Sequence, residues 1–313
     1  MINRTQNYSV SVRGSELWFT LRTRRCRHRE KNGGCEFCGF GELDRAFKTP
    51  LSLEEARLQA TNFFLELLRS GKNPEKILKL SYISMANSVL DPKVVAPEAL
   101  KTILEISHGY LQNISEISFE SRPESINTTI LDKLQILIHQ IFGRMLICEI
   151  AVGMETYSEP RRIKSGKGIT NKMILKLAEI LAERDWKLRG YFMHNMLMRH
   201  NNLKELLEDV RFMARLRDKT GVQPAMLIQR GYVPANMKSK HIFKGFKEVP
   251  DKVALSHLKK GAELAKELDI LFEIDPTIED RCAVKAEISS SAPYEKAVKV
   301  YNNTLNPAKL CLR

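Results

Sequence analysis

The chain has 313 residues, and its 50 Lys and Arg outnumber its 37 Asp and Glu, which gives a formal net charge of +13. Its 43% hydrophobic content is too high for a disordered chain, and 16 Gly and 12 Pro without a fixed repeat exclude collagen and low-complexity classes. The most apolar stretch, 134–147, contains Gln135, His139, Gln140 and Arg144, so we expect no membrane helix and no membrane partner. Residues 1–30 lack the apolar core of a signal peptide, which favours a cytoplasmic protein.

The predicted elements alternate between strands and helices along the chain. The segment 15–23 alternates as a strand does, and 51–68 has helical spacing behind a capping signal at Ser52. Further strands are predicted at 77–84, 116–120, 146–155, 188–193 and 225–229, an edge strand at 271–274, and helices at 97–107, 129–142, 173–184, 203–219 and 254–268. Six strands that alternate with helices predict an α/β fold with a parallel sheet, right-handed crossovers and chemistry at the strand C-terminal ends. We expect a core over 1–245 and a C-terminal helix and extension over 246–313.

Three of the six cysteines are clustered. Cys26, Cys35 and Cys38 form a C-x8-C-x2-C pattern, whereas Cys148 is predicted to be a buried strand residue and Cys282 and Cys311 fall in an irregular tail. A disulfide framework would need a small secreted domain, so this clustering favours a metal. A structural zinc ion needs a fourth ligand, for which His28 is available. Three thiolates on a [4Fe–4S] cluster would instead leave one iron open to a ligand.

The residues around these cysteines resemble a known superfamily. Glu36-Phe-Cys38 is followed by Gly39-Phe-Gly41, and a predicted strand leads into the loop. This pattern resembles the radical S-adenosylmethionine (SAM) superfamily, in the branch of the Elongator catalytic subunit, where long first gaps occur. The segments 87–92, 118–124, 152–156 and 164–170 follow in the order expected of that branch. Together they are most similar to the archaeosine-biosynthesis radical SAM family, which acts on transfer RNA, over residues 15–245. The resemblance implies a partial (β/α)6 TIM-like barrel of parallel strands, which the C-terminal extension over 246–313 would close.

The resemblance implies a cofactor set and a ligand set. Cys26, Cys35 and Cys38 would hold a [4Fe–4S] cluster, and SAM would bind its open iron. A reductant protein such as flavodoxin or ferredoxin would supply the electron that reduces the cluster. The cofactor-binding candidates at the loop and the strand ends are Phe37, Gly39, Asn87, Ser88, Ser121, Arg122, Gly153, Glu155 and Arg230. The weaker substrate candidates are Lys164, Lys167, His194 and Asn195. The substrate would be a nucleoside or a tRNA base of the 7-deazaguanine type, and no catalytic side chain is assigned.

Several of these residues also have a purely structural interpretation. Asn87 and Ser88 could cap the turn before Asp91-Pro92, and Arg122 could be a solvated turn residue. For Glu155 the site interpretation is favoured, because an unpaired carboxylate after an apolar run would be costly. The loop 165–168 resembles a phosphate-binding loop but lacks the full P-loop pattern, so hydrolysis of a nucleoside triphosphate is not supported.

The positive charge leaves the partner open. Arg22, Arg24, Arg25, Arg27, Arg29 and Lys31 crowd one segment around Cys26, where only Glu30 opposes them. This charge could serve solubility alone, or it could bind RNA or a phosphorylated substrate. Two alternatives to a tRNA-modifying enzyme therefore stand: a radical SAM enzyme that acts on a small metabolite, and a zinc-loop protein that binds nucleic acid.

Overall fold

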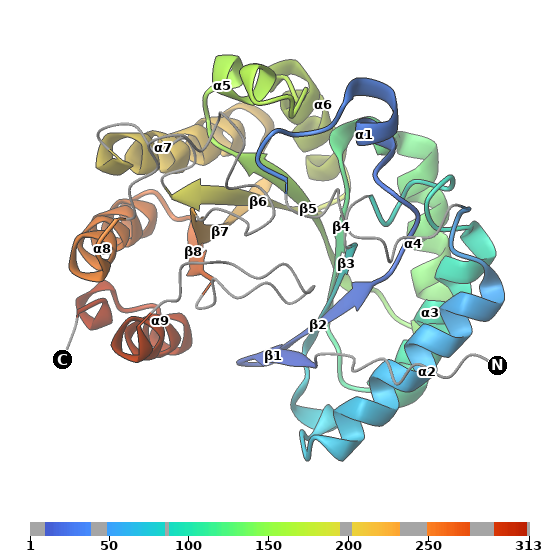
Figure 1. The fold of residues 1–313 in the computed structure, drawn as a ribbon. Coiled ribbons are helices and arrows are strands. Elements are labelled where there is room, and N and C mark those ends of the chain that lie inside the picture. The colour runs from blue at the N-terminus through green and yellow to red at the C-terminus, as the bar shows by residue number, and fades with distance from the viewer. Residues whose placement is uncertain are drawn as a thin grey trace. The chain divides into compact units, whose positions relative to one another are not determined.

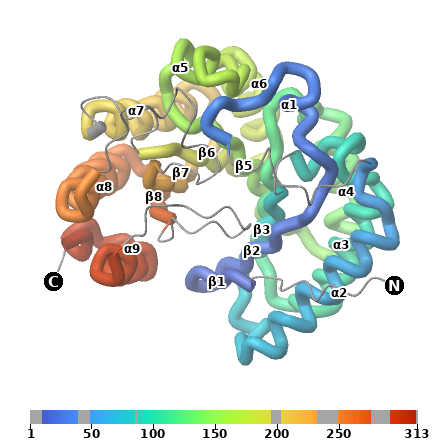
Figure 2. The backbone as a smooth tube through the Cα atoms, viewed as in Figure 1, coloured from blue at the N-terminus to red at the C-terminus, as the bar shows by residue number. Residues whose placement is uncertain are grey.

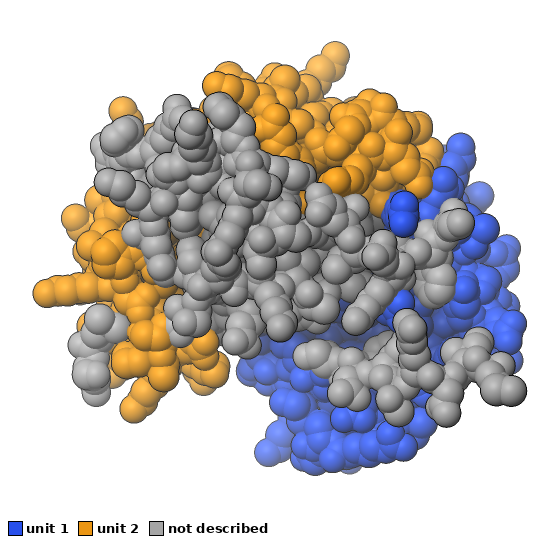
Figure 3. Space-filling view, in the orientation of Figure 1, with its two compact units in different colours: residues 1–25, 44–121, 125–148 blue, residues 26–43, 122–124, 149–313 orange. Residues whose placement is uncertain are grey.

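The structure is a computed structural model that describes residues 10–38, 49–84, 88–194, 202–231, 249–275 and 291–311. The chain divides into two compact units, coloured separately in Figure 3. Unit 1 comprises residues 1–25, 44–121 and 125–148, and unit 2 comprises residues 26–43, 122–124 and 149–313. The domain boundary predicted at 245 lies outside the described residues.

Unit 1 is built on parallel strands with helices along one side of them (Figure 1). Its strands are β1 (Ser11–Arg13), β2 (Glu16–Leu21), β3 (Lys79–Ser84) and β4 (Glu116–Glu120), of which only β1 pairs antiparallel. Its helices are α2 (Leu53–Arg69), the short η2 (Pro74–Lys76), α3 (Pro97–Tyr110) and α4 (Thr128–Phe142). The predicted cap at Ser52 is confirmed, because its hydroxyl accepts from Glu55 N while the Glu55 carboxylate accepts from Ser52 N. Phe19 of β2 stacks on Phe63 of α2 at 4.1 Å between ring centroids in the core of this unit.

Unit 2 repeats the strand–helix alternation. Its strands are β5 (Ile147–Glu155, whose first two residues belong to unit 1), β6 (Lys187–His194), β7 (Gln223–Arg230) and β8 (Leu271–Ile274), all parallel. Its helices are α1 (Arg27–Asn32), α5 (Glu159–Lys164), α6 (Asn171–Ala182), α7 (Asn202–Thr220), α8 (Asp251–Glu267), α9 (Ala292–Thr304) and the short η6 (Pro307–Lys309). The short helix η3 (Pro123–Ser125) has its first two residues in unit 2 and its last in unit 1. The predicted α/β class with the parallel strand–helix repeat of a partial TIM-like barrel is confirmed.

The two faces of the unit 2 strands carry different side chains. On one face Phe272 packs against Tyr301 of α9, and the Tyr301 hydroxyl donates to the Phe272 carbonyl. On the opposite face Arg189 of β6 forms ion pairs with Glu149 of β5 at 2.9 Å and with Glu273 of β8 at 3.1 Å. Because side chains alternate along a strand, odd and even positions of β6 point to different environments. Residues at the ends of these strands therefore point to one face or the other according to their register.

The structure adds one strand, β1, and three α-helices, α1, α5 and α9, that the sequence pattern did not predict. The prediction of an irregular tail is therefore wrong for residues 292–304, where Ser291 caps α9 by accepting from Tyr294 N and where Tyr294, Val298 and Tyr301 are buried on one face. Within the described part of the chain, no helix combines the length and apolarity that crossing a membrane requires.

Candidate functional site

The cysteine loop, defined as residues 26–38, folds around the short helix α1 in unit 2. Cys26 immediately precedes α1, and the helix ends at Gly33, where φ is +78°. Gly34 follows with φ of +79°, a left-handed conformation that glycine adopts without steric cost. The chain thereby turns back, so that Cys35 and Cys38 follow α1 within one tight segment whose Cys38 N–H donates to the Cys35 carbonyl at 3.2 Å. None of the three cysteines is in a disulfide, and all three are partly exposed.

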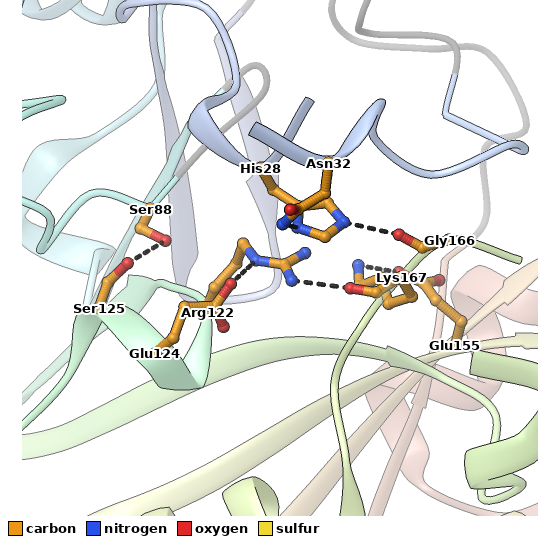
Figure 4. A network of polar contacts seen from close by, with 9 residues as sticks. All are labelled: His28, Asn32, Ser88, Arg122, Glu124, Ser125, Glu155, Gly166 and Lys167. Carbon is orange, nitrogen blue, oxygen red and sulfur yellow. Dashed lines mark hydrogen bonds and ion pairs between the residues drawn. The ribbon is translucent and has the colours of Figure 1, made fainter. Parts of the chain in front are cut away.

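The cysteine loop is seated on a second loop, residues 165–168, which connects α5 to α6 (Figure 2). Glu36 N–H donates to the Ser165 carbonyl at 2.9 Å, and His28 Nε2 lies 2.6 Å from the Gly166 carbonyl. Figure 4 shows the His28 ring between Gly166 and Asn32, whose Nδ2 lies 3.1 Å from His28 Nδ1. Because the Asn32 amide nitrogen can only donate, His28 Nδ1 accepts and Nε2 carries the proton that is donated to Gly166.

This arrangement fixes the chemistry of His28. Burial is the main cause that lowers its pKa, which agrees with a neutral ring. Both ring nitrogens are engaged in hydrogen bonds, so neither is directed at a metal. The contacts of His28 therefore do not favour it as the fourth zinc ligand, a role that the sequence left open.

Two basic side chains and two carboxylates lie next to the cysteine loop (Figure 4). The Lys167 ammonium pairs with Glu155 Oε1 at 2.8 Å and lies 5.8 Å from the centre of the Phe37 ring. Arg122 pairs with Glu124 and donates from its guanidinium to the Lys167 carbonyl at 2.7 Å. Burial acts to lower the pKa of Lys167, but the Glu155 carboxylate opposes it, and the net effect raises that pKa, so Lys167 is a cation.

Glu155, the last residue of β5, has an unfavourable backbone conformation. Its φ of +65° lies in the left-handed region, which is costly for a residue with a side chain. The pairing of β5 with β6 shifts register between Gly153 and Glu155, and such bulges redirect a side chain. At Gly153 a Cβ atom would lie 2.7 Å from Lys167 Nζ and 2.8 Å from Glu155 Oε1, so a larger residue there would displace the ion pair from its present position. The strain therefore serves to place a carboxylate over Gly153.

Burial and two nearby cations act in opposite directions on the thiol of Cys35. Burial raises the pKa of Cys35, while the Lys167 and Arg122 cations act in the opposite direction. Among the described residues, no three His, Cys, Asp or Glu side chains converge in a metal-binding arrangement. The loop nonetheless carries three cysteine thiols outside disulfides, and two cations lie near Cys35, which fits a group that binds through thiolates and carries negative charge.

Two predicted cofactor residues in unit 1 follow neighbouring strands, Ser88 after β3 and Ser121 directly after β4. Ser88 is buried and accepts from the Ser125 hydroxyl at 3.1 Å. Ser121 is also buried, and its hydroxyl accepts from Leu90 N at 3.0 Å. The Asp91 carboxylate accepts from Lys93 N at 2.9 Å, so Asp91 itself stabilises the turn. The predicted residues Asn87 and Gly39 lie outside the described residues.

The predicted residues at the ends of β6 and β7 do not join the cysteine-loop network. His194 is 2% exposed, and its Nε2 lies 3.2 Å from Nδ1 of His257 on α8. Arg230 is buried, pairs with Asp251 of α8 at 2.5 Å and lies over the Tyr294 ring of α9. Both side chains thus point to the helix-facing side of their strands. Of the other two substrate candidates beside Lys167, Lys164 is exposed at the end of α5, and Asn195 is outside the described residues.

One residue that supports the site carried no recognisable signal. Arg162 reads as one more charge in the basic run of α5, yet its side chain is fully buried. Its Nε donates to the Ile169 carbonyl at 2.9 Å, and its guanidinium also bonds to the Thr156 carbonyl and to Asn171 Oδ1. Arg162 therefore fixes both ends of the segment that contains loop 165–168.

Comparisons with known proteins extend only to the fold. No protein-family model matches the chain, and no curated protein sequence matches it. Among solved structures, the chain is similar to Elp3 from the archaeon Methanocaldococcus infernus, with a TM-score of 0.61 and 10% identity over 93% of this chain and 63% of that one. It is also similar to the coproporphyrinogen III oxidase HemN from Escherichia coli, a radical SAM enzyme, with a TM-score of 0.50 and 12% identity over 81% of this chain and 52% of that one. The chain thus spans less than two thirds of either protein, and the likeness shows a shared fold.

Proposed function

We propose that this protein is a radical SAM enzyme whose cysteine loop binds a [4Fe–4S] cluster through Cys26, Cys35 and Cys38. The observation that carries the proposal is a loop with three cysteines outside disulfides, in which Cys35 lies next to the Lys167, Arg122 and Glu155 charges. The fold shared with HemN supports it. Such a cluster, reduced by one electron from a flavodoxin- or ferredoxin-type donor, supplies the cleavage of SAM to methionine and a 5′-deoxyadenosyl radical that takes a hydrogen atom from the substrate.

The protein side chains would supply charge complementarity for SAM. Its methionine part carries a carboxylate and an ammonium group, and the network offers both signs of charge within one site. Arg122 and Lys167 suit the carboxylate, whereas Glu155 suits the ammonium group or the ribose hydroxyls. Gly153 would let the backbone approach the ligand, as it already lets the Lys167–Glu155 pair approach. Phe37 would cover the ligand from the cysteine loop.

Anaerobic reconstitution tests this function directly. After incubation with iron and sulfide, the protein should release 5′-deoxyadenosine when SAM and dithionite are added. Cys35→Ala should reduce this release to the background, because a thiolate ligand is lost. Cys148→Ala is the matched control: Cys148 is buried in β5, burial raises its pKa to about 12, and its removal should leave release unchanged. Absence of cluster absorbance, or equal turnover in Cys35→Ala, would overturn the proposal.

For the substrate we infer an anionic molecule, with a nucleoside or a tRNA base of the 7-deazaguanine type as the first candidate. The helix within the cysteine loop carries Arg27, Arg29 and Lys31 against one acidic residue, Glu30. Lys31 is exposed, and Arg161 and Lys164 lie on α5, whose C-terminal end leads into the seat of that loop. Positive side chains beside a reactive centre suit a phosphate backbone.

Salt dependence separates the two substrate classes. If tRNA is the substrate, its binding should weaken steeply with salt, with a slope in log K of about −0.7 to −0.9 for each phosphate contact. A small metabolite would instead stimulate 5′-deoxyadenosine release with little dependence on salt and would make tRNA dispensable. A zinc-loop protein would bind nucleic acid without SAM cleavage and would contain zinc without sulfide.

A further inference from the structure

Three consecutive carbonyls of the loop 165–168 each accept a hydrogen bond from a different part of the candidate site. The Ser165 carbonyl accepts from Glu36 N at 2.9 Å, and the Gly166 carbonyl accepts from His28 Nε2 at 2.6 Å. The Lys167 carbonyl accepts from Arg122 at 2.7 Å. Two of these donors belong to the cysteine loop, so the loop 165–168 binds it through the backbone as well as bringing the Lys167 charge to it.

The glycines of this loop are explained by contact with the cysteine loop. Gly166 has φ of +72°, and a Cβ atom there would lie 2.5 Å from the Gly34 carbonyl oxygen. Gly168 has φ of +69°, and its Cβ would lie 3.1 Å from His28 Cε1. A separation of 2.5 Å from a backbone oxygen cannot be relieved by a side-chain rotation. The similarity of Ser165-Gly-Lys-Gly168 to a phosphate-binding loop therefore has another explanation, which is close packing of two loops.

The loop 165–168 is fixed by contacts that do not involve the cysteine loop. Ser165 N–H donates to the Arg161 carbonyl, and Lys167 N–H donates to the Arg162 carbonyl, both at 2.9 Å. The Ser165 hydroxyl donates to the Arg162 carbonyl at 3.1 Å, and the buried Arg162 side chain donates to Ile169. The loop can therefore serve as a rigid seat, and the cysteine loop is the part that docks on it.

We propose that His28 is a positioning residue that docks the cysteine loop on loop 165–168 through its Nε2–H···O bond to Gly166, so that the backbone of the cysteine loop is held in place before any cluster binds. The bond is formed by a neutral ring whose other nitrogen is held by Asn32. The consequence for iron loading rests on the proposed function, whereas the docking itself does not.

Digestion of the metal-free protein by trypsin tests the docking. Arg27, Arg29 and Lys31 provide cleavage sites within the cysteine loop. His28→Ala should raise the rate of cleavage there about tenfold, or about 1.4 kcal/mol, because the hydrogen bond that docks the loop is lost. His28→Gln should keep cleavage within about twofold of the unsubstituted protein, because its amide N–H can donate to Gly166. Equal cleavage rates in His28→Ala and the unsubstituted protein, or no rescue by His28→Gln, would overturn the proposal.

A pair of glycine substitutions separates loop docking from backbone strain. Gly166→Ala and Gly221→Ala both place a side chain at positive φ, +72° and +80°. Gly221, at the end of α7, has no atom within 4 Å of its Cβ position, whereas Gly166 meets Gly34. Gly166→Ala should increase cleavage in the cysteine loop, and Gly221→Ala should not, with circular dichroism confirming that both fold. Equal cleavage in the two variants would contradict docking.

Iron incorporation then connects docking to function. His28→Ala and Gly166→Ala should take up iron and sulfide more slowly than the unsubstituted protein, and His28→Gln should regain the rate. If no form of the protein binds iron, the proposed function fails, but the digestion experiment still tests whether His28 docks the cysteine loop. If iron uptake and digestion are both unchanged in His28→Ala, the docking proposal fails while the proposed function stands.

Discussion

Three strands of unit 2 end in polar residues, and the side chains of these residues lie in two different environments. Glu155 at the end of β5 pairs with Lys167 beside the cysteine loop. His194 at the end of β6 and Arg230 at the end of β7 are buried against helices α8 and α9. A polar residue at the C-terminal end of a parallel strand is therefore a site candidate only when its side chain also points to the correct face.

The register of the strands explains the difference. His194 and Arg230 are paired neighbours, and both share the face of Phe272, which packs on α9. Glu155 lies beyond a register shift, and its positive φ brings its carboxylate over Gly153, which is paired with Tyr191 on the opposite face. One bulge thus places a carboxylate in the site, and regular alternation keeps the other two side chains out of it.

The largest expected effect concerns Arg230. Arg230→Leu should lower the free energy of unfolding by about 3 kcal/mol, because it leaves Asp251 and the Val249 carbonyl without their buried partner. Urea denaturation measures this loss. Lys101→Ala, which removes an exposed pair with Glu105, is the control and should change stability by less than about 0.5 kcal/mol. If Arg230→Leu keeps its stability but loses SAM cleavage, Arg230 is a cofactor residue, and the distinction between Glu155 as a site residue and Arg230 as a structural residue is wrong.

A smaller effect is expected from the pH dependence of His194. Burial, followed by the neighbouring His257 and Arg230, lowers the pKa of His194 to about 3. The folded state therefore binds fewer protons than the unfolded state below the ordinary value of 6.5, so this contribution to stability is full above pH 6.5 and is lost as the pH falls towards 3. Between pH 7 and pH 5 the unsubstituted protein should lose about 2 kcal/mol more than His194→Gln.

Denaturation of both proteins across this pH range makes the measurement, and titrating groups that do not interact with His194 cancel in the difference. Parallel pH profiles for His194→Gln and the unsubstituted protein would show that His194 reaches solvent and would make it available to a substrate again.

The smallest free-energy change is expected at the site itself. Lys167→Met should weaken SAM binding to the reconstituted protein about tenfold, or about 1.4 kcal/mol, because Glu155 loses its counter-charge and the ligand loses a cation. Lys164→Met is the matched control three residues away, and since Lys164 is exposed it should alter affinity less than about twofold. Equal weakening by the two substitutions would indicate general electrostatic attraction rather than a specific site.

Much of the fold was predictable because its strands and helices have strong periodicity. The predicted strand at 116–120 coincides with β4, and the predicted helix at 129–142 differs from α4 by one residue. The helices α1 and α5 were missed because each has six residues, too few for a periodic pattern, and the sequence Arg27–Asn32 is entirely polar. The helix α9 was missed although Pro293 at its start and the spacing of Tyr294, Val298 and Tyr301 are recognisable helix signals.

The candidate site was predictable as a set of residue types but not as a geometry. The cysteine spacing and the Gly153–Glu155 segment identified residues that the structure places in one network. The face to which His194 and Arg230 point depends on strand register, which the sequence does not specify. The role of Arg162 was hidden because a buried arginine that bonds to carbonyls looks, in sequence, like any basic surface residue.

The central claim is that Cys26, Cys35 and Cys38 bind a cluster with one iron left open for SAM. Electron paramagnetic resonance of the reconstituted and reduced protein, recorded before and after SAM is added and combined with metal and sulfide analysis, tests it most directly. We predict about four iron and four sulfide per chain and a signal that changes when SAM binds. Zinc without sulfide, or a signal that SAM leaves unchanged, would contradict the claim.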